Sequence, residues 1–135
     1  MLILILDRNA GTPVYRQVVD QVRFQASSGV LAAGTELPST RALAKEHGVN
    51  PMTVSKAYGE LERLGVLERR LGRSHVVAAR SASDAGRDRR AEFKRALAPA
   101  VQAALQLGIA PDQAVEMFRS MLFEGTGRAA KTQAR

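Results

Sequence analysis

The chain begins with MLILIL, its only continuous run of apolar residues, and the polar pair Asp7-Arg8 ends that run. Its six residues are far fewer than the roughly 20 that a membrane-spanning helix requires. The run also lacks the basic leader and the small-residue cleavage site of a secretory signal peptide. The pattern therefore predicts a short buried strand.

After this run, apolar residues recur at spacings of three and four, which is typical of amphipathic helices. Valines line one side of the first such segment, and we expect a helix over 13–28. Thr12 is expected to cap this helix, Pro13 suits its first position, and Gly29 ends it.

Two shorter segments with the same period follow. Ser39 is expected to cap a short helix over 40–47. Asn50 is a favoured cap for the next helix, from Pro51 to about Leu64. A proline at the first helical position costs no hydrogen bond, because the N–H there has no partner within the helix. Pro51 is therefore expected to start this helix.

After Gly65 the spacing of apolar residues becomes that of β-strands. It predicts two short strands on either side of the glycine turn in LGRS. Three helices followed by a hairpin are the order of a winged helix-turn-helix domain. We therefore expect a mainly α fold with a small β wing, with the domain over 1–79 and its helix-turn-helix at about 39–58. The remainder is expected to divide into a linker or frayed helix start at 80–90, a short C-terminal helical dimerisation region at 91–124, and a disordered tail at 125–135.

Composition favours a polyanionic partner, because 20 Lys and Arg residues against 13 Asp and Glu residues give a net charge of +7. Up to Arg80 there are 11 basic and 7 acidic residues, and the rest of the chain holds 9 and 6. Charge alone therefore identifies no binding half, and a basic surface is also simply a soluble one. The absence of cysteine excludes disulfides and thiolate metal sites and leads us to expect a cytoplasmic protein that is not bound to a membrane.

The sequence contains no catalytic constellation. It has two histidines, no paired carboxylates at metal-ligand spacing and no glycine-rich phosphate-binding motif. We therefore expect no enzyme activity, no cofactor and no metal site. His75 is expected to lie on a strand surface and not to bind a ligand.

The helix that begins at Pro51 has two faces. Val54, Tyr58 and Leu61 recur at helical spacing and are expected to face the core. The other face is small and polar near the N-terminus, which is the end that a helix-turn-helix inserts into the DNA major groove. Amide and hydroxyl groups can bond base edges or phosphates, lysine can neutralise a phosphate, and methionine can touch a thymine methyl. The residues on this face are Asn50, Met52, Thr53, Ser55 and Lys56.

Several longer motifs resemble one known family. PVYRQV, SGVLAAGTELPSTRALA, VNPMTVSKAY and LERRLGRS are similar to the DNA-binding domain of the GntR family of bacterial transcription regulators. The resemblance covers about residues 11–79 without a gap. The short helical region after it is similar to that of the YtrA subfamily, whose members carry about two C-terminal helices for dimerisation.

The resemblance implies a homodimer that binds a palindromic operator in double-stranded DNA, usually as a repressor. It implies that Arg41 reads a base, that the first residues of the helix after the turn contact bases or phosphates, and that the wing tip enters the minor groove. Met52 stands where the subfamily commonly has a polar residue, and Pro51 stands where some members have an arginine. The candidate DNA-binding residues are Ser39, Arg41, Asn50, Met52, Thr53, Ser55, Lys56, Gly72 and Arg73.

The same residues are also compatible with other roles. Arg41 could be a surface arginine paired with Glu36, and Tyr15 could bond a phosphate or pack locally. The whole domain could instead be a protein-interaction module that binds no specific DNA. The sequence identifies neither an operator nor a small-molecule effector.

Apolar residues recur at helical spacing in the C-terminal region, and they predict a dimer interface because two short helices cannot bury both stripes on their own. The alternative is a monomer in which the stripes fold back on the winged helix. The expected interface residues are Phe93, Leu97, Val101, Leu105, Val115, Phe118 and Leu122.

Overall fold

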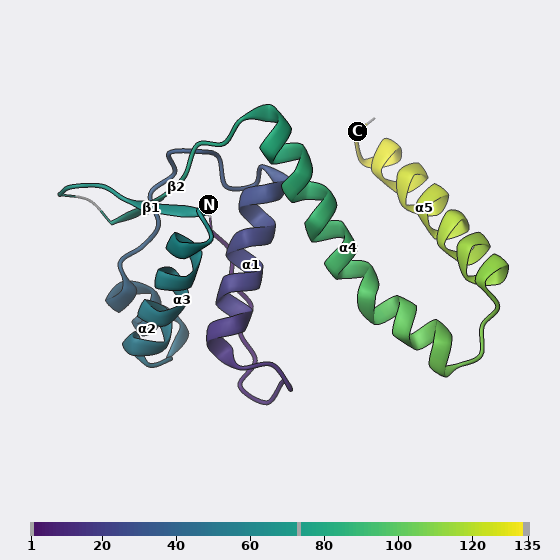
Figure 1. Cartoon of the computed structure of the whole chain (residues 1–135), viewed down its shortest axis with the longest axis horizontal. Helices are drawn as coiled ribbons and strands as arrows, with labels where there is room; N and C mark the ends of the chain where they lie inside the picture. The colour runs from purple at the N-terminus through teal and green to yellow at the C-terminus, as the bar shows by residue number, and fades with distance from the viewer. Residues whose placement is uncertain (1, 73, 134–135) are drawn as a thin grey trace. The chain divides into compact units, whose positions relative to one another are not determined.

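The computed structural model of the protein describes residues 2–72 and 74–133 (Figure 1). The chain divides into two units, one up to Glu92 and one from Phe93 onward. The first unit has the expected mainly α fold with a small β wing. In chain order the elements are α1 (Val14–Ser28), α2 (Thr40–His47), α3 (Pro51–Arg63), β1 (Leu67–Arg69), β2 (His75–Val77), α4 (Ala82–Gln106) and α5 (Pro111–Gln133).

Side-chain caps set the starts of α2 and α3. The hydroxyl oxygen of Ser39 accepts the Ala42 N–H at 3.1 Å, and Asn50 Oδ1 accepts the Met52 N–H at 2.8 Å. Pro51 occupies the first turn of α3, as expected. These bonds satisfy donors that have no partner within the helix, which explains why both helices begin where the sequence predicts.

The start of α1 differs from the prediction. Its N-cap is Pro13, which makes no side-chain capping bond, so Thr12 does not cap the helix. The Thr12 carbonyl instead accepts a hydrogen bond from the Gln17 side chain at 2.8 Å. The other end is as expected, because Gly29 adopts the left-handed conformation (φ 84°) that ends a helix.

A single core holds α1, α2, α3 and the hairpin together. Valines of α1 face the inner side of α3, and leucines from α2, β1 and the loops close the remaining sides. Residues that are at most 2% exposed dominate this core: Val18, Val19, Val22, Leu31, Leu37, Leu43, Ala44, Val54, Ala57, Tyr58, Leu61 and Leu67.

The wing is a two-stranded antiparallel sheet with a third segment beside it. Arg69 pairs with His75 and Leu67 with Val77 across the two strands. On the other edge of β2, Glu36 forms an isolated bridge with Val76. The segment that leads to α2 is therefore attached to the wing.

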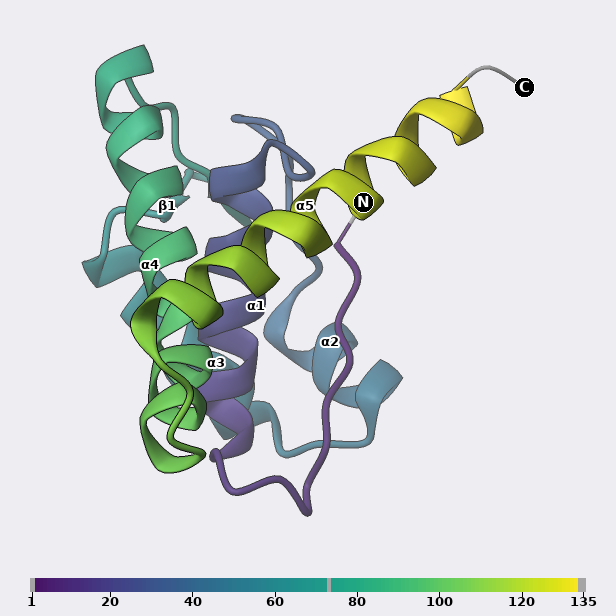
Figure 2. The same ribbon diagram turned by 90° about the vertical axis from the view of Figure 1, so that its right-hand side faces the viewer.

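The N-terminal run is not a sheet strand, contrary to the prediction. It lies extended and antiparallel to α1 (Figure 2), where three glutamine side chains bond its backbone. The amides of Gln25, Gln21 and Gln17 each accept a backbone N–H and donate to the carbonyl of the same residue. The paired residues are Ile3 (3.1 and 2.6 Å), Ile5 (2.8 and 2.6 Å) and Asp7 (2.8 and 2.7 Å).

The spacing of these glutamines explains why they reach alternate residues. Four residues of a helix rise about 6 Å, and two residues of an extended chain rise about 6.6 Å, so the two periods nearly match. Side chains alternate between the two faces of an extended chain. Leu4 therefore points toward the protein and is 9% exposed, whereas Ile3 and Ile5 are 59% and 78% exposed. The glutamine amides thus replace the neighbouring strand that the apolar pattern suggested.

The second unit contains the rest of α4 and α5. The two helices are joined by a turn in which Gly108 has a φ of 68°, and the Phe93 and Phe118 rings lie 6.1 Å apart. Residues 80–90, expected as a linker or frayed helix start, include the first turns of α4, whose start is capped by Ser81 Oγ. The expected disordered tail is helical as far as Gln133.

We expect Gln21→Ala to lower the free energy of unfolding by about 1–2 kcal/mol, because it removes two hydrogen bonds worth about 1 kcal/mol each. Urea denaturation measures this change. Gln102→Ala, at an exposed position of α4, is the matched control and should change stability by less than about 0.5 kcal/mol. Equal losses for both variants would contradict the role of the glutamine ladder.

Candidate nucleic-acid interface

Helix α3 shows the two faces that its sequence predicts. Val54, Ala57, Tyr58 and Leu61 are buried, whereas Met52 is 79% exposed. The outward set lies over the first two turns, where the positive end of the helix dipole favours an anion. Asn50, Ser55 and Lys56 are exposed and Thr53 is half-buried, so the structure brings the predicted α3 residues to one surface.

The two capping side chains present donors to solvent. The carboxamide oxygen of Asn50 accepts the Met52 N–H, and the hydroxyl oxygen of Ser39 accepts the Ala42 N–H. The Asn50 NH₂ group and the Ser39 hydroxyl hydrogen therefore remain available. Phosphate oxygens only accept hydrogen bonds, so both caps match a phosphate backbone.

Lys56 is held by an aromatic ring. Its Nζ lies 3.8 Å from the ring centroid of Tyr15, on α1, and the Arg16 guanidinium lies 5.5 Å from the same ring. This cation–π contact orients the ammonium group of Lys56 on the exposed side of α3. Of the two roles considered for Tyr15, the structure shows local packing.

Arg41 is exposed on α2 and forms no ion pair within the part of the chain that the structure describes. Glu36, the alternative partner, instead accepts the Ser74 N–H at 3.3 Å. The Arg41 guanidinium therefore keeps its donors for a ligand.

An open groove of about 790 Å³ separates the start of α2 from the wing. Ser39 and Thr40 line one side, and Arg69 lines the other. Gly72, with a φ of 73°, turns the hairpin, and Arg73 lies outside the described residues. Sequence reasoning missed Thr40 and also Leu71, whose side chain is fully exposed beside this turn.

His75 is not a strand-surface residue, contrary to the prediction. It is 8% exposed, and its ring meets the Tyr58 ring edge-on with centroids 5.2 Å apart. The Tyr58 hydroxyl donates to the Pro38 carbonyl at 2.8 Å. Burial raises the pKa of the Tyr58 phenol, so it stays a neutral donor. These contacts join α3 to the wing and to the segment before α2.

Two acidic side chains of α3 have local hydrogen-bonding partners. Glu60 accepts hydrogen bonds from Arg63, and this partner holds the pKa of the Glu60 carboxyl below its usual value. Glu62 Oε2 lies 3.3 Å from His75 Nε2. Both carboxylates belong to the C-terminal half of α3, away from the donors at its N-terminus.

Among residues 2–72 and 74–133 no three or more His, Asp or Glu side chains gather closely enough to hold a metal ion. No helix in those same ranges is both long and apolar enough to cross a membrane.

Known proteins resemble this chain in sequence and in fold. Residues 14–77 match the family described as bacterial regulatory proteins, gntR family. The solved structure of YtrA from Sulfolobus acidocaldarius, a GntR-family transcription factor, is 30% identical, with a TM-score of 0.55 over 90% of this chain and 97% of that one. The chain belongs to the GntR family. Its relatives in this family are transcription regulators and not enzymes.

Two further relatives extend the comparison. The HTH-type transcriptional repressor YtrA of Bacillus subtilis is 41% identical over 73 residues, which are 54% of this chain and 56% of that protein. A transcriptional regulator from Oenococcus oeni is 27% identical, with a TM-score of 0.64 over 89% of this chain and 99% of that one. The chain thus matches little more than half the length of the Bacillus repressor. The two YtrA proteins support the YtrA subfamily.

We expect Tyr58→Phe to lower the free energy of unfolding by about 1–2 kcal/mol, because it leaves the Pro38 carbonyl without its partner. Thermal and urea unfolding measure the change. Tyr15→Phe is the matched control, since the Tyr15 hydroxyl bonds no other described residue, and it should cost less than about 0.5 kcal/mol. A Tyr58→Phe variant as stable as this control would show that the hydroxyl does not hold the segment before α2.

Proposed function

We propose that the protein is a transcriptional repressor that binds a palindromic operator in double-stranded DNA as a homodimer. The observation that carries this proposal is the exposed N-terminal face of α3. Its capping side chains present donors, Lys56 is oriented by Tyr15, and a basic wing lies across a groove from Ser39. Double-stranded DNA fits such a surface, because its phosphates accept hydrogen bonds and its base edges can be bonded in the grooves.

In the proposed complex, the first turns of α3 enter the major groove. Asn50, Ser39 and Lys56 contact phosphates, and Thr53 and Ser55 bond phosphates or base edges. Met52 is too exposed to serve the core, and its thioether chain suits apolar contact with a thymine methyl. Arg41 reads a guanine edge, because a guanidinium can donate two bonds to one base.

The wing is proposed to enter the adjacent minor groove. Gly72 allows the tight turn, and the guanidinium groups of Arg69 and Arg73 follow the negative potential of a narrow groove. Arg70 is less available, because it bonds Glu68 at 3.0 Å. Leu71 provides an apolar contact at the wing tip.

Dimerisation is proposed for the second unit. Its large apolar side chains are exposed to an unusual degree, with Val101 at 55%, Leu105 at 70% and Leu122 at 53%. Another subunit would cover these stripes and also pair two copies of α3 with half-sites about one DNA turn, or about 34–36 Å, apart. The expected contacts are made by Phe93, Leu97, Val101, Leu105, Val115, Phe118 and Leu122. The bound dimer would repress by occupying the operator.

We expect Arg41→Ala to weaken binding to a duplex selected from a random-sequence pool by about 1–3 kcal/mol, the usual contribution of a bidentate base contact. Binding to unselected DNA should weaken much less. Fluorescence anisotropy at fixed salt measures both affinities. Arg63→Ala, which removes an arginine already bonded to Glu60, is the control and should leave both nearly unchanged. An equal loss of affinity for the two DNAs would show that Arg41 contacts a phosphate and does not read a base.

The same titrations at several salt concentrations test the protein-interaction alternative. Neutralising phosphates releases counterions, so DNA affinity should fall steeply as salt rises. If no duplex is selected above background at low salt, the DNA-binding proposal is wrong.

We expect Val101→Asp to convert the full chain from dimer to monomer, because it places a charge in the proposed apolar interface. Gln102→Asp, on the neighbouring exposed position, should remain dimeric. Light scattering at micromolar concentration distinguishes the two states. A fragment ending at Glu92 should be monomeric, and a dimeric fragment or a monomeric parent protein would contradict dimerisation through the second unit.

A further inference from the structure

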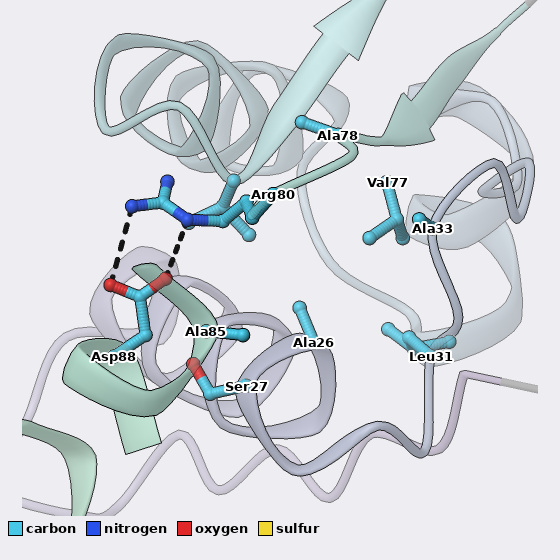
Figure 3. A pocket seen from close by; sticks show the side chains of 10 residues that line it. Ala26, Ser27, Leu31, Ala33, Val77, Ala78, Arg80, Ala85 and Asp88 are labelled. Carbon is cyan, nitrogen blue, oxygen red and sulfur yellow. Dashed lines mark hydrogen bonds and ion pairs between the residues drawn. The ribbon is translucent and has the colours of Figure 1, made fainter. Parts of the chain in front are cut away.

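A pocket of about 140 Å³, open to solvent on one side, lies in the first unit between the end of α1, the end of β2 and the first turns of α4. Figure 3 shows Leu31, Ala33 and Val77 on one side and the Arg80–Asp88 pair on the opposite side. Most of the lining is aliphatic. None of its lining residues belongs to the proposed DNA-binding surface.

Alanines keep this space open. Ala26 lines it from α1 and Ala85 lines it from α4, each with only a methyl group. A leucine at either position would carry three more carbon atoms into the cavity. The space therefore depends on side-chain size at particular positions, which makes it testable by substitution.

The polar groups at the cavity limit what it can bind. Arg80 Nε lies 2.6 Å from Asp88 Oδ2, and Arg80 Nη2 donates to Asp88 Oδ1 at 3.3 Å, so the two charges satisfy each other. A charged ligand would compete with that pair. The Ser27 hydroxyl, in contrast, bonds no other described residue and can both donate and accept. The lining thus suits an uncharged ligand with one polar group.

Size points to a single ring. An apolar cavity of about 150 Å³ can hold benzene, whereas an ordered water molecule needs two to four polar partners. The aliphatic side of this cavity supplies none. We propose that the cavity binds a small uncharged molecule with one ring and one hydroxyl group, a phenol-like effector whose hydroxyl bonds Ser27.

The position of the cavity gives such a ligand a regulatory role, which rests on the DNA-binding function proposed above. Asp88 and Glu92 share one face of α4, and Glu92 Oε1 lies 2.5 Å from Arg23 Nε on α1. Ion pairs thus attach the first turns of α4 to α1 and to Arg80. A ligand between these turns and the winged helix adds contacts that favour this attachment. Because α4 continues into the proposed dimerisation unit, occupancy and operator binding become linked.

Phenol titration of the full chain tests the site, with methyl NMR signals of Leu31, Val66 and Val77 as the readout. We expect saturable shifts of these signals. Ala85→Leu and Ala26→Leu should each weaken phenol binding at least about tenfold while circular dichroism shows a folded protein. Ala103→Leu, at an exposed position further along α4, should bind phenol as the parent does. Ser27→Ala should weaken the binding of phenol but not that of benzene.

Failure of the site and failure of the DNA-binding proposal give different results. Phenol binding that does not saturate, or that is equal in the parent and both filled variants, would overturn the site. With the selected duplex, saturating phenol should change affinity at least about fivefold in the parent and not in Ala85→Leu. An unchanged affinity would overturn the regulatory role. A protein that binds phenol but no duplex would reject the proposed function and leave the ligand site intact.

Discussion

Tyr58 contacts each of the segments that shape the candidate DNA-binding surface. Its ring is 1% exposed on the inner side of α3, its hydroxyl bonds the Pro38 carbonyl just before α2, and its edge-on neighbour His75 begins β2. A buried hydroxyl must find a partner, and here the partner is the backbone that leads to the Ser39 cap. Tyr58 therefore links α3 both to the wing and to the segment before α2.

The same packing decides which polar groups remain available at the surface. The side chains that cap α2 and α3, Ser39 and Asn50, accept backbone N–H groups with their oxygens, and their own donor groups face the solvent. The Glu60 carboxylate is paired with Arg63, and the Glu62 carboxylate lies within hydrogen-bonding distance of the His75 ring. The result is a surface on which donors and cations outweigh acceptors near the N-terminus of α3, although the first unit as a whole is only moderately basic.

The glutamine ladder and the ion pair to α4 lie on opposite faces of α1, because Gln21 and Arg23 are two residues, or about 200°, apart on the helix. Extended backbone normally needs a neighbouring strand, but the amides of Gln17, Gln21 and Gln25 satisfy it from a helix. This lets Leu4 cover the core without a further strand in the sheet. Arg23 and Arg80 form ion pairs with the start of α4, so the connection to the second unit begins as ordered helix rather than as a free linker.

The sequence by itself determined several features, because each follows from local chemistry. These features are the order of the helices and the hairpin, the caps at Ser39 and Asn50, the role of Pro51 and the outward face of α3. Each depends on residues within one or two turns, where spacing and hydrogen-bonding capacity can be seen directly. Only the tertiary structure decided the pairing of the N-terminal run with α1, the burial of His75, the Tyr15–Lys56 contact and the cavity beside Arg80 and Asp88. These features join residues distant in sequence, and an apolar run or a polar side chain does not specify which distant partner will satisfy it.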